Sequence, residues 1–215
     1  NVVSKHDIYG EVYGPKYNKY SESTLDCWFE LGTHVGGDDN IVLDYANKTG
    51  IDRLFDSVII VIMNSTKHAG TCYMSVPFPD ETSDWGTGLS ISYFPIGEDE
   101  QELGEVINHE AGGHGFAKLA DEYAYQTNGT IPFDEIQSYK QEAKFGWWKN
   151  VDFTNDPTQV KWYHFLTDSR YSNEGLGIYE GAFTYWTGAY RPTENSIMNT
   201  NVGGFNAPSR EAIYY

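Results

Sequence analysis

The stretch VINHEAGGHGFAKLADEY, from Val106 to Tyr123, decides how the fold of the remaining chain is interpreted. Its two histidines, His109 and His114, are five residues apart, and Glu110 follows the first of them. Five residues of regular α-helix rotate about 140° beyond a full turn, so the two rings would point in different directions. Gly112 and Gly113 lie between the histidines, although each glycine inside a helix costs about 1 kcal/mol relative to alanine. Glycines in such a place need a structural reason.

A π-type turn would supply that reason. Hydrogen bonding between residues i and i+5 widens the turn and returns residues five apart to the same side of the helix, and glycine tolerates the widening. His109 and His114 could then bind one zinc ion, as the histidines of the common HExxH motif do. In this spacing the chain resembles the dipeptidyl peptidase III family, which has a working HExxxH zinc site. The alternative is a hydrogen-bonded surface cluster without a metal, which an isolated short motif often proves to be.

The zinc interpretation assigns a role to each of the three central residues. His109 and His114 would bind the ion through neutral ring nitrogens, and both must therefore be deprotonated. Glu110 would be the general base, which takes a proton from the attacking water and later delivers it to the leaving amine.

Zinc also needs a third protein ligand. The candidates, in order of preference, are Asp121, then Glu122, then a distant residue such as His164 or Glu180. Asp121 can reach the ion only if the helix stops soon after His114, and Gly115 could mark that stop. Asp121 and Glu122 could instead be a pair at the end of the helix that orients His114.

Composition and charge exclude several classes of function. The chain has 215 residues, of which 40% are hydrophobic, and this suits one globular domain over residues 1–215. The formal net charge of −17 repels nucleic acid and anionic membranes. No apolar run approaches the ~18 residues of a membrane span, so we expect none. The aromatic content of 16% indicates either core packing or a groove for peptide or sugar.

Three further expectations concern the cysteines, the processing of the chain and its location. Cys27 and Cys72 allow one disulfide or two reduced thiols. The first residues, NVVSKH, resemble the inside of a strand, and no signal peptide precedes them, so we expect a processed or truncated part of a longer precursor. We expect the protein to be secreted, periplasmic or on the cell surface, and we take a monomer as the default.

Hydrophobic periodicity predicts both helices and strands before the histidine stretch. Asp39 could cap a short helix that ends at Gly50. The apolar run over 58–62 predicts a strand buried on both faces, at the centre of a sheet, and the alternation over 89–94 predicts a strand near the sheet edge. A helix with acidic residues in its first turn then continues into the histidines. The residues of this helix that should face the core are Leu103, Val106, Ile107 and Ala111.

A second amphipathic helix is predicted over 134–145. Its inward-facing residues should be Ile136, Tyr139 and Ala143. The remainder of the chain, which is rich in glycine, tryptophan and tyrosine, should be irregular with short helices.

Four segments together resemble the IgA metallopeptidase family of gut bacteria. They are HEAGGHGFAKLADEY at 109–123, the buried strand with Asn64 and Ser65 after it, IYEGAFTY at 178–185 and YRPTENSIMNT at 190–200. The resemblance implies a zinc endopeptidase that acts on protein or peptide substrates. Many members of the family carry a compact HExGH, so the additional residue here departs from the family pattern.

The resemblance also implies a fold. It would be α/β and metzincin-like, with a twisted mixed sheet, the active-site helix packed under the sheet, and an irregular C-terminal lobe. The upper lobe would extend to about residue 120 and the lower lobe from about residue 121. The substrate would lie extended along a sheet edge that either His68–Tyr73 or Leu89–Tyr93 could supply.

The same resemblance assigns roles outside the helix. The segment SIM at 196–198 is similar to the Met-turn of the metzincins, which would make Met198 an apolar floor beneath the histidines. The third metzincin ligand falls on Ala120, one residue before Asp121. Tyr123, Tyr190 and Arg191 are candidate donors for stabilising the oxyanion.

Two alternative functions remain beside the zinc peptidase. One is a glycan-binding or glycosidase domain, which would use the many aromatic and acidic residues. The other is a catalytically dead binding module, in which the additional glycine has abolished the metal site. The zinc content of the protein separates the peptidase from both alternatives.

Overall fold

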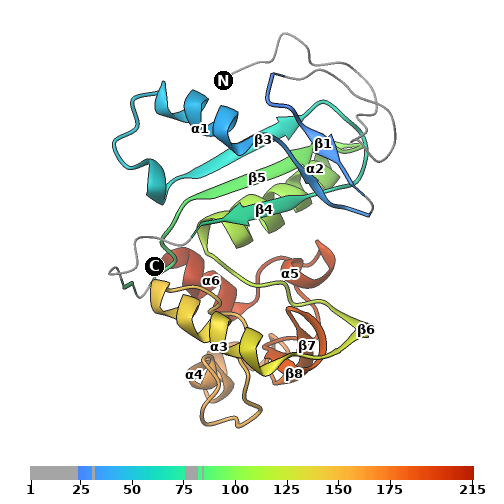
Figure 1. Cartoon of the computed structure of the whole chain (residues 1–215). Helices are drawn as coiled ribbons and strands as arrows, with labels where there is room; N and C mark the ends of the chain where they lie inside the picture. The colour runs from blue at the N-terminus through green and yellow to red at the C-terminus, as the bar shows by residue number, and fades with distance from the viewer. Residues whose placement is uncertain (1–23, 31, 76–81, 84) are drawn as a thin grey trace. The chain divides into compact units, whose positions relative to one another are not determined.

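The computed structural model describes residues 24–30, 32–75, 82–83 and 85–215 (Figure 1). The chain divides into two compact units. The first contains the residues up to Ser75 together with Gly88–Ala111, and the second contains Gly112–Tyr215 together with the segment that ends at Thr87. The boundary falls inside the helix that carries the two histidines. The prediction of one catalytic domain with lobes meeting near residue 120 stays a prediction.

The first unit contains a mixed three-stranded sheet, as expected for an α/β protein. Its strands are β3 (Val58–Met63), β5 (Ser90–Pro95) and β4 (Thr71–Met74), in the order β3-β5-β4. β3 runs parallel to β5, and β4 runs antiparallel to it.

The predicted positions of two of these strands are wrong, because β5 is central and β3, within the described residues, lies at an edge. All six residues of β5 are buried. In β3, Val61 and Met63 are buried, whereas Ile60 and Ile62 are 46% and 52% exposed. An apolar run alone does not reveal whether one or both faces of a strand are covered.

A short helix, α1 (Asp39–Asn47), follows the hairpin of β1 (Trp28–Phe29) and β2 (Val35–Gly36). The predicted cap at Asp39 is wrong by one residue. Asp38 is the N-cap, and its Oδ1 accepts hydrogen bonds from the amides of Asn40 and Ile41. Asp39 instead accepts a hydrogen bond of 2.6 Å from the Tyr93 hydroxyl on β5. Asp39 therefore ties the helix to the sheet.

The predicted helix before the histidines is present. α2 (Glu100–Val106) is capped by Asp99, whose side chain accepts from the Glu102 amide. The helix continues without interruption into η3 (Ile107–Phe116), which is a π-helix. The inward face is confirmed, since Val106 and Ala111 form a buried cluster with Phe94, against which Leu103 and Ile107 pack.

The second unit contains a sheet that the sequence did not predict. Its strands are β6 (Ala124–Thr130), β8 (Thr184–Arg191) and β7 (Tyr179–Ala182), in the order β6-β8-β7. β6 is parallel to β8, β7 is antiparallel to it, and both pairings shift register. Phe183, the one residue between β7 and β8, and Thr184, the first residue of β8, both have positive φ and make the tight turn. The expectation of irregular structure is therefore wrong here.

The helices of the second unit are mostly short, as expected. They are α3 (Phe133–Glu142), α4 (Tyr163–Leu166), α5 (Ile197–Thr200) and α6 (Ala207–Tyr214). Short 3-10 helices lie at Ala143–Phe145 and Ser169–Tyr171 in this unit, and at Leu54–Asp56 in the first unit. α3 and the turn after it confirm the helix predicted over 134–145. No helix among the described residues is long and apolar enough to cross a membrane.

Aromatic side chains form much of the core of the second unit. Trp147, Trp148 and Trp162 are all buried. Tyr139 on α3 stacks on Phe183, with 4.0 Å between the ring centroids. These residues favour core packing as the use of the aromatic content.

Candidate metal centre

The π-helix resolves the spacing problem of the two histidines. The i+5 pattern extends over ten residues, from Ile107 to Phe116, where the sequence suggested a single widened turn. His109 and His114 therefore project from one side of the helix. One ligand atom from each of His109, His114 and Asp121 lies within 4.8 Å of the other two. Both histidines are buried, and Asp121 is partly exposed.

A reversal of the chain after the helix brings Asp121 back to it. The Ala117 amide donates to Gly112 O at 3.1 Å, and the Leu119 amide donates to Gly113 O at 2.9 Å. Lys118 has a φ of +51° and makes the turn, so the left-handed residue is not the predicted Gly115. The helix nevertheless ends soon after His114, as the reach of Asp121 requires.

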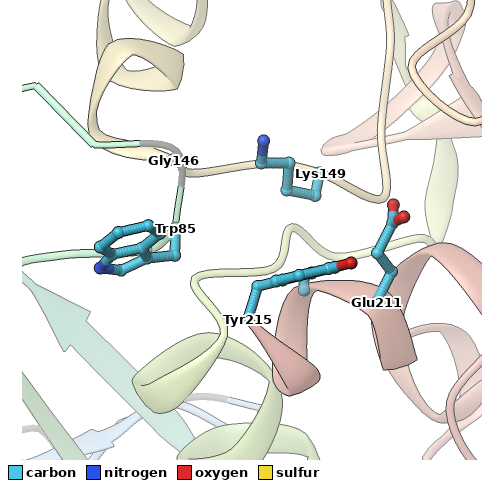
Figure 2. A pocket seen from close by; sticks show the side chains of 7 residues that line it. Trp85, Gly146, Lys149, Glu211 and Tyr215 are labelled. Carbon is cyan, nitrogen blue, oxygen red and sulfur yellow. The ribbon is translucent and has the colours of Figure 1, made fainter.

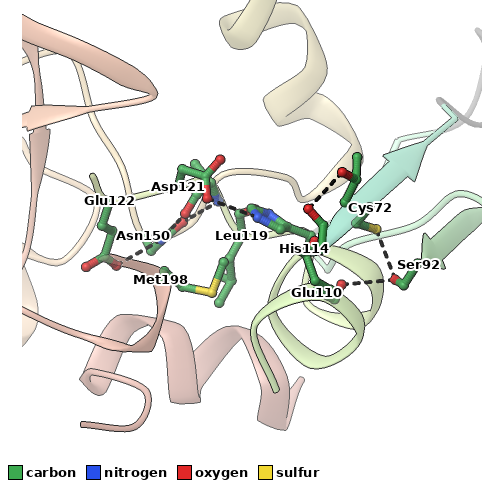
Figure 3. Close-up of polar contacts among 12 residues, drawn as sticks. Cys72, Ser92, Glu110, His114, Leu119, Asp121, Glu122, Asn150 and Met198 are labelled. Atoms are coloured by element: carbon green, nitrogen blue, oxygen red, sulfur yellow. Dashed lines mark hydrogen bonds and ion pairs between the residues drawn. The ribbon is translucent and has the colours of Figure 1, made fainter. Parts of the chain in front are cut away.

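His114 is oriented at both of its ring nitrogens (Figure 3). Nδ1 donates to Leu119 O at 2.7 Å, and Nε2 lies 3.1 Å from Asp121 Oδ1. A proton on Nδ1 leaves the Nε2 lone pair for a metal, which is the usual arrangement for a histidine ligand. Two ligands of one tetrahedral zinc ion are about 3.3 Å apart when each bond is about 2.05 Å. The separation of these two atoms is close to that value.

Glu110 is buried beside the sheet of the first unit. Its carbonyl oxygen accepts from Ser92 Oγ on β5 at 3.1 Å, and Ser92 Oγ also lies 3.2 Å from Cys72 Sγ on β4. The serine has one proton, so when it donates to the Glu110 carbonyl, the Cys72 thiol can donate to the serine oxygen. No disulfide joins Cys72 and Cys27, so of the two options that the sequence left open the structure shows two reduced thiols.

Glu122 lies in a buried polar cluster, which we call the Glu122 cluster and define as Glu122, Asn150, Ser196 and Asn206. Asn150 and Asn206 each donate to Glu122 Oε1 at 2.9 Å, and Ser196 Oγ donates to Oε2 at 2.7 Å. Burial raises the pKa of Glu122, and the hydrogen bonds from these three residues oppose the shift. Both oxygens of the Glu122 carboxylate therefore accept hydrogen bonds from within the cluster.

The Glu122 cluster fixes the chain on both sides of Asp121. Asn150 pairs with both backbone groups of Ala120, at 2.9 Å and 2.8 Å. The Glu122 amide donates to Met198 O at 2.8 Å. Sequence reasoning missed Asn150 and Asn206, because a lone asparagine carries no signal of a distant partner.

Met198 is fully buried in the second unit. It packs with Ala117, Leu119 and Ile197, and the carbonyl of Leu119 is the one that orients His114. The Met198 amide donates to Ser196 Oγ at 3.2 Å, so the segment proposed as a Met-turn is tied to the Glu122 cluster.

The remaining candidate residues lie outside the histidine cluster. His164 Nε2 is 3.2 Å from Glu211 Oε1 at the surface. Glu180 Oε1 accepts from the Gly188 amide at 3.0 Å, and the Tyr190 hydroxyl is 3.4 Å from the same oxygen.

Arg191 and Tyr123 also have contacts of their own. The Arg191 guanidinium donates to the backbone carbonyls of Gly181, at 2.6 Å, and Thr193, at 3.1 Å. Tyr123 is 5.5 Å from Tyr125, ring centroid to ring centroid.

A separate cavity of about 390 Å³ lies within the second unit (Figure 2). None of the predicted site residues lines it. Its lining residues are Trp85, Gly86, Gly146, Lys149, Glu211, Ala212 and Tyr215.

The mixed α/β fold and the cluster of two histidines with one aspartate define a candidate metallopeptidase. A comparison with protein families agrees: the pattern of the IgA peptidase M64 family matches residues 45–173. The chain belongs to this family, and it is therefore a member of a family of peptidases. The match includes the histidine stretch, while the segments at 178–185 and 190–200 lie beyond it. A comparison with curated proteins finds no match.

Proposed function

We propose that the chain is a zinc-dependent endopeptidase with Glu110 as its general base. The observation that carries the proposal is the convergence of His109, His114 and Asp121 within 4.8 Å, from the same segment that places Glu110 next to the first histidine. The finer fold belongs to the same proposal: a metzincin-like domain in which Met198 forms an apolar floor. We also propose that the protein is secreted, periplasmic or on the cell surface.

The three side chains fit zinc as a donor set. Two imidazoles and one carboxylate are ligands that zinc accepts, and a catalytic site keeps a fourth position for water or substrate. Asp121 could instead act only as a hydrogen-bond partner of His114. Leu119 O already orients that ring through Nδ1, which supports Asp121 as a ligand.

The residues around the ion divide the work of hydrolysis. When bound, zinc supplies Lewis-acid chemistry, which polarises the scissile carbonyl and makes water a better nucleophile near neutral pH. The Glu110 carboxylate accepts the proton of the attacking water and donates it to the leaving amine. For the oxyanion, Tyr123, Tyr190 and Arg191 remain the candidate donors. The hydroxyl of Tyr190 contacts Glu180, and the guanidinium of Arg191 binds backbone carbonyls.

The peptide substrate would pair with β4. Leu89–Tyr93 cannot supply the edge, because most of this segment lies in β5, which is paired on both sides. β4, within the described residues, pairs only with β5, and Gly70 just before it lies against Glu110. Main-chain hydrogen bonds along β4 would hold an extended peptide near the general base.

Glycosidase chemistry is disfavoured by the surroundings of Glu122. A glycosidase needs two carboxyl groups that face each other across the substrate. Glu122 is fully buried and accepts hydrogen bonds from Asn150, Ser196 and Asn206, so it cannot face Asp121.

Zinc content tests the proposal. The purified protein should hold about one equivalent of zinc, and a chelator should abolish its hydrolysis of a denatured protein substrate until zinc is returned. His109→Ala and His114→Ala should each lose both zinc and activity.

His164→Ala is the matched control, because this histidine pairs with Glu211 outside the cluster. It should keep zinc and activity. Hydrolysis that persists without metal, or zinc that stays in both His109→Ala and His114→Ala, would contradict the proposal.

A further inference from the structure

Gly70 lies against the side chain of Glu110 within the first unit. A Cβ atom added at Gly70 would be 2.5 Å from Oε1, 2.9 Å from Cγ and 3.0 Å from Cδ of Glu110. Packed atoms do not approach so closely, so any larger residue would displace one of the two groups. Gly70 is not one of the positive-φ glycines among the described residues. Its missing side chain therefore serves this close approach and not a left-handed turn.

The backbone of Gly70 is held from two directions. Its amide donates to Thr33 O at 3.0 Å, and its carbonyl accepts from Thr71 Oγ1 at 2.7 Å. Thr71 Oγ1 in turn accepts from the Val35 amide at 3.2 Å. A retreat of Gly70 would break these bonds, so the surface that faces Glu110 is rigid.

The backbone of Glu110 is fixed as well. The residue lies inside η3, and its carbonyl accepts from Ser92 Oγ on the central strand. Only the side chain of Glu110 is left to move when Gly70 is enlarged. Because all three atoms belong to one flexible side chain, a change of its rotamer, which moves Cγ, Cδ and the carboxylate together, would relieve the clash while both backbones stay in place.

We propose that Gly70 is a positioning residue for the general base. The absence of a side chain at Gly70 sets where the Glu110 carboxylate lies, and therefore its distance from the water it deprotonates. The inference rests on the proposed function, in which Glu110 moves the proton. A misplacement of about 1 Å can cost about 100-fold in rate.

The test is the Gly70→Ala variant of the whole chain. The turnover number kcat should fall about 100-fold, while KM changes little, because the substrate-binding edge is intact. The zinc content should stay at one equivalent, and the unfolding temperature of the zinc-free protein should match that of the wild type. A purely structural role for Gly70 would lower the unfolding temperature or the zinc content.

Gly104→Ala is the matched control. Gly104 lies in α2, and an added Cβ there meets nothing within 4 Å. This variant should keep the wild-type kcat and gain a little stability, because alanine is the better helix former.

A double-mutant cycle with Glu110→Gln tests whether Gly70→Ala lowers kcat through the carboxylate of Glu110. In the Glu110→Gln background the proton carrier is already absent, so adding Gly70→Ala should cost no further kcat. Wild-type kcat in Gly70→Ala, an additive loss in the double variant, or a loss of zinc would each overturn the inference. If Glu110→Gln alone keeps full activity, the proposed function fails; if it is inactive while Gly70→Ala is fully active, only this inference fails.

Discussion

Asp121 and Glu122 are neighbours in the sequence and have opposite surroundings. Asp121 is partly exposed and lies 3.1 Å from His114, whereas Glu122 is fully buried among amides and a hydroxyl. Consecutive side chains of an extended segment point to opposite sides. One acidic residue therefore faces the candidate metal centre, and the other holds the backbone that carries it.

Glu110→Gln should separate proton transfer from metal binding. The amide keeps the shape of the carboxylate but cannot accept the proton of water, so kcat should fall about 10²–10⁴-fold. Zinc content should remain at one equivalent, because Glu110 is not a ligand in this account. Steady-state kinetics and metal analysis of the same preparation measure both quantities. Wild-type kcat in this variant would refute the assigned role.

Glu122→Ala should destabilise the protein. It leaves one N–H of each of the buried amides of Asn150 and Asn206 without its acceptor, and each unsatisfied group costs about 1–3 kcal/mol. The free energy of unfolding, measured with urea, should therefore fall by at least about 2 kcal/mol.

Glu174→Ala is the control for this measurement, since Glu174 makes an exposed ion pair with Arg210. It should change the free energy of unfolding by less than about 1 kcal/mol. Equal effects of the two substitutions would show that the Glu122 cluster has no special structural role.

At the residue scale, the sequence allowed us to predict which residues form the candidate site, but not which distant residues hydrogen-bond to their neighbours. His109, Glu110 and His114 carry a recognisable spacing, and the two glycines predicted the widened helix. Nothing in the sequence connects Glu122 to Asn150 or Asn206, which are 28 and 84 residues away. Contacts of this kind depend on the tertiary fold, and periodicity does not reveal them.

At the scale of elements, the π-helix is the feature that accommodates the five-residue spacing of the two histidines. η3 continues directly from α2, so a change of hydrogen-bonding pattern within one helix brings His109 and His114 together. The glycines within it also supply the carbonyls that accept from Ala117 and Leu119 in the reversal. The widened helix and the return of Asp121 are thus parts of one arrangement.

Deleting Gly113 should be tolerated. The deletion leaves the two histidines four residues apart, and a regular α-helix then holds them on one face. The variant should keep about one equivalent of zinc and a cooperative unfolding transition. Loss of zinc or of the fold would show that the centre requires the π-helix itself. Metal analysis and circular dichroism distinguish these outcomes.

The predictions for strands were weaker than those for helices. β3 and β5 were both located, but their positions in the sheet were exchanged, because Ile60 and Ile62 are apolar and yet exposed. The sheet of the second unit was missed because its strands contain glycine and polar residues and shift register. A helix with a side-chain cap, such as α2, or with a regular apolar face, such as α3, does not have this ambiguity.

At the scale of the whole molecule, Lys161 should shape the pH dependence of stability. Its ammonium donates to the carbonyls of Trp148 and Val151, at 2.7 Å and 2.6 Å. Burial lowers the pKa of Lys161 from 10.5 to about 8. The negative charge of Asp152 raises this pKa and so offsets part of the effect of burial. Between these two values the unfolded chain binds more protons than the folded one, so the contribution of Lys161 to stability increases with pH.

Urea unfolding of the wild type and of Lys161→Met at a series of pH values tests this prediction. The free energy of unfolding of the wild type, minus that of the variant, should rise between pH 8 and 10.5. Below that window the difference should be flat. A difference that does not change with pH, or that falls through this window, would contradict the assignment.

The most direct test of the account is a crystal structure of the zinc-loaded protein with data collected at the zinc absorption edge. We predict one strong anomalous peak, with His109, His114 and Asp121 each about 2.0–2.2 Å from it and the ring of His114 bound through Nε2. Rings of His109 and His114 that point apart, or a zinc ion bound elsewhere on the chain, would contradict the central claim.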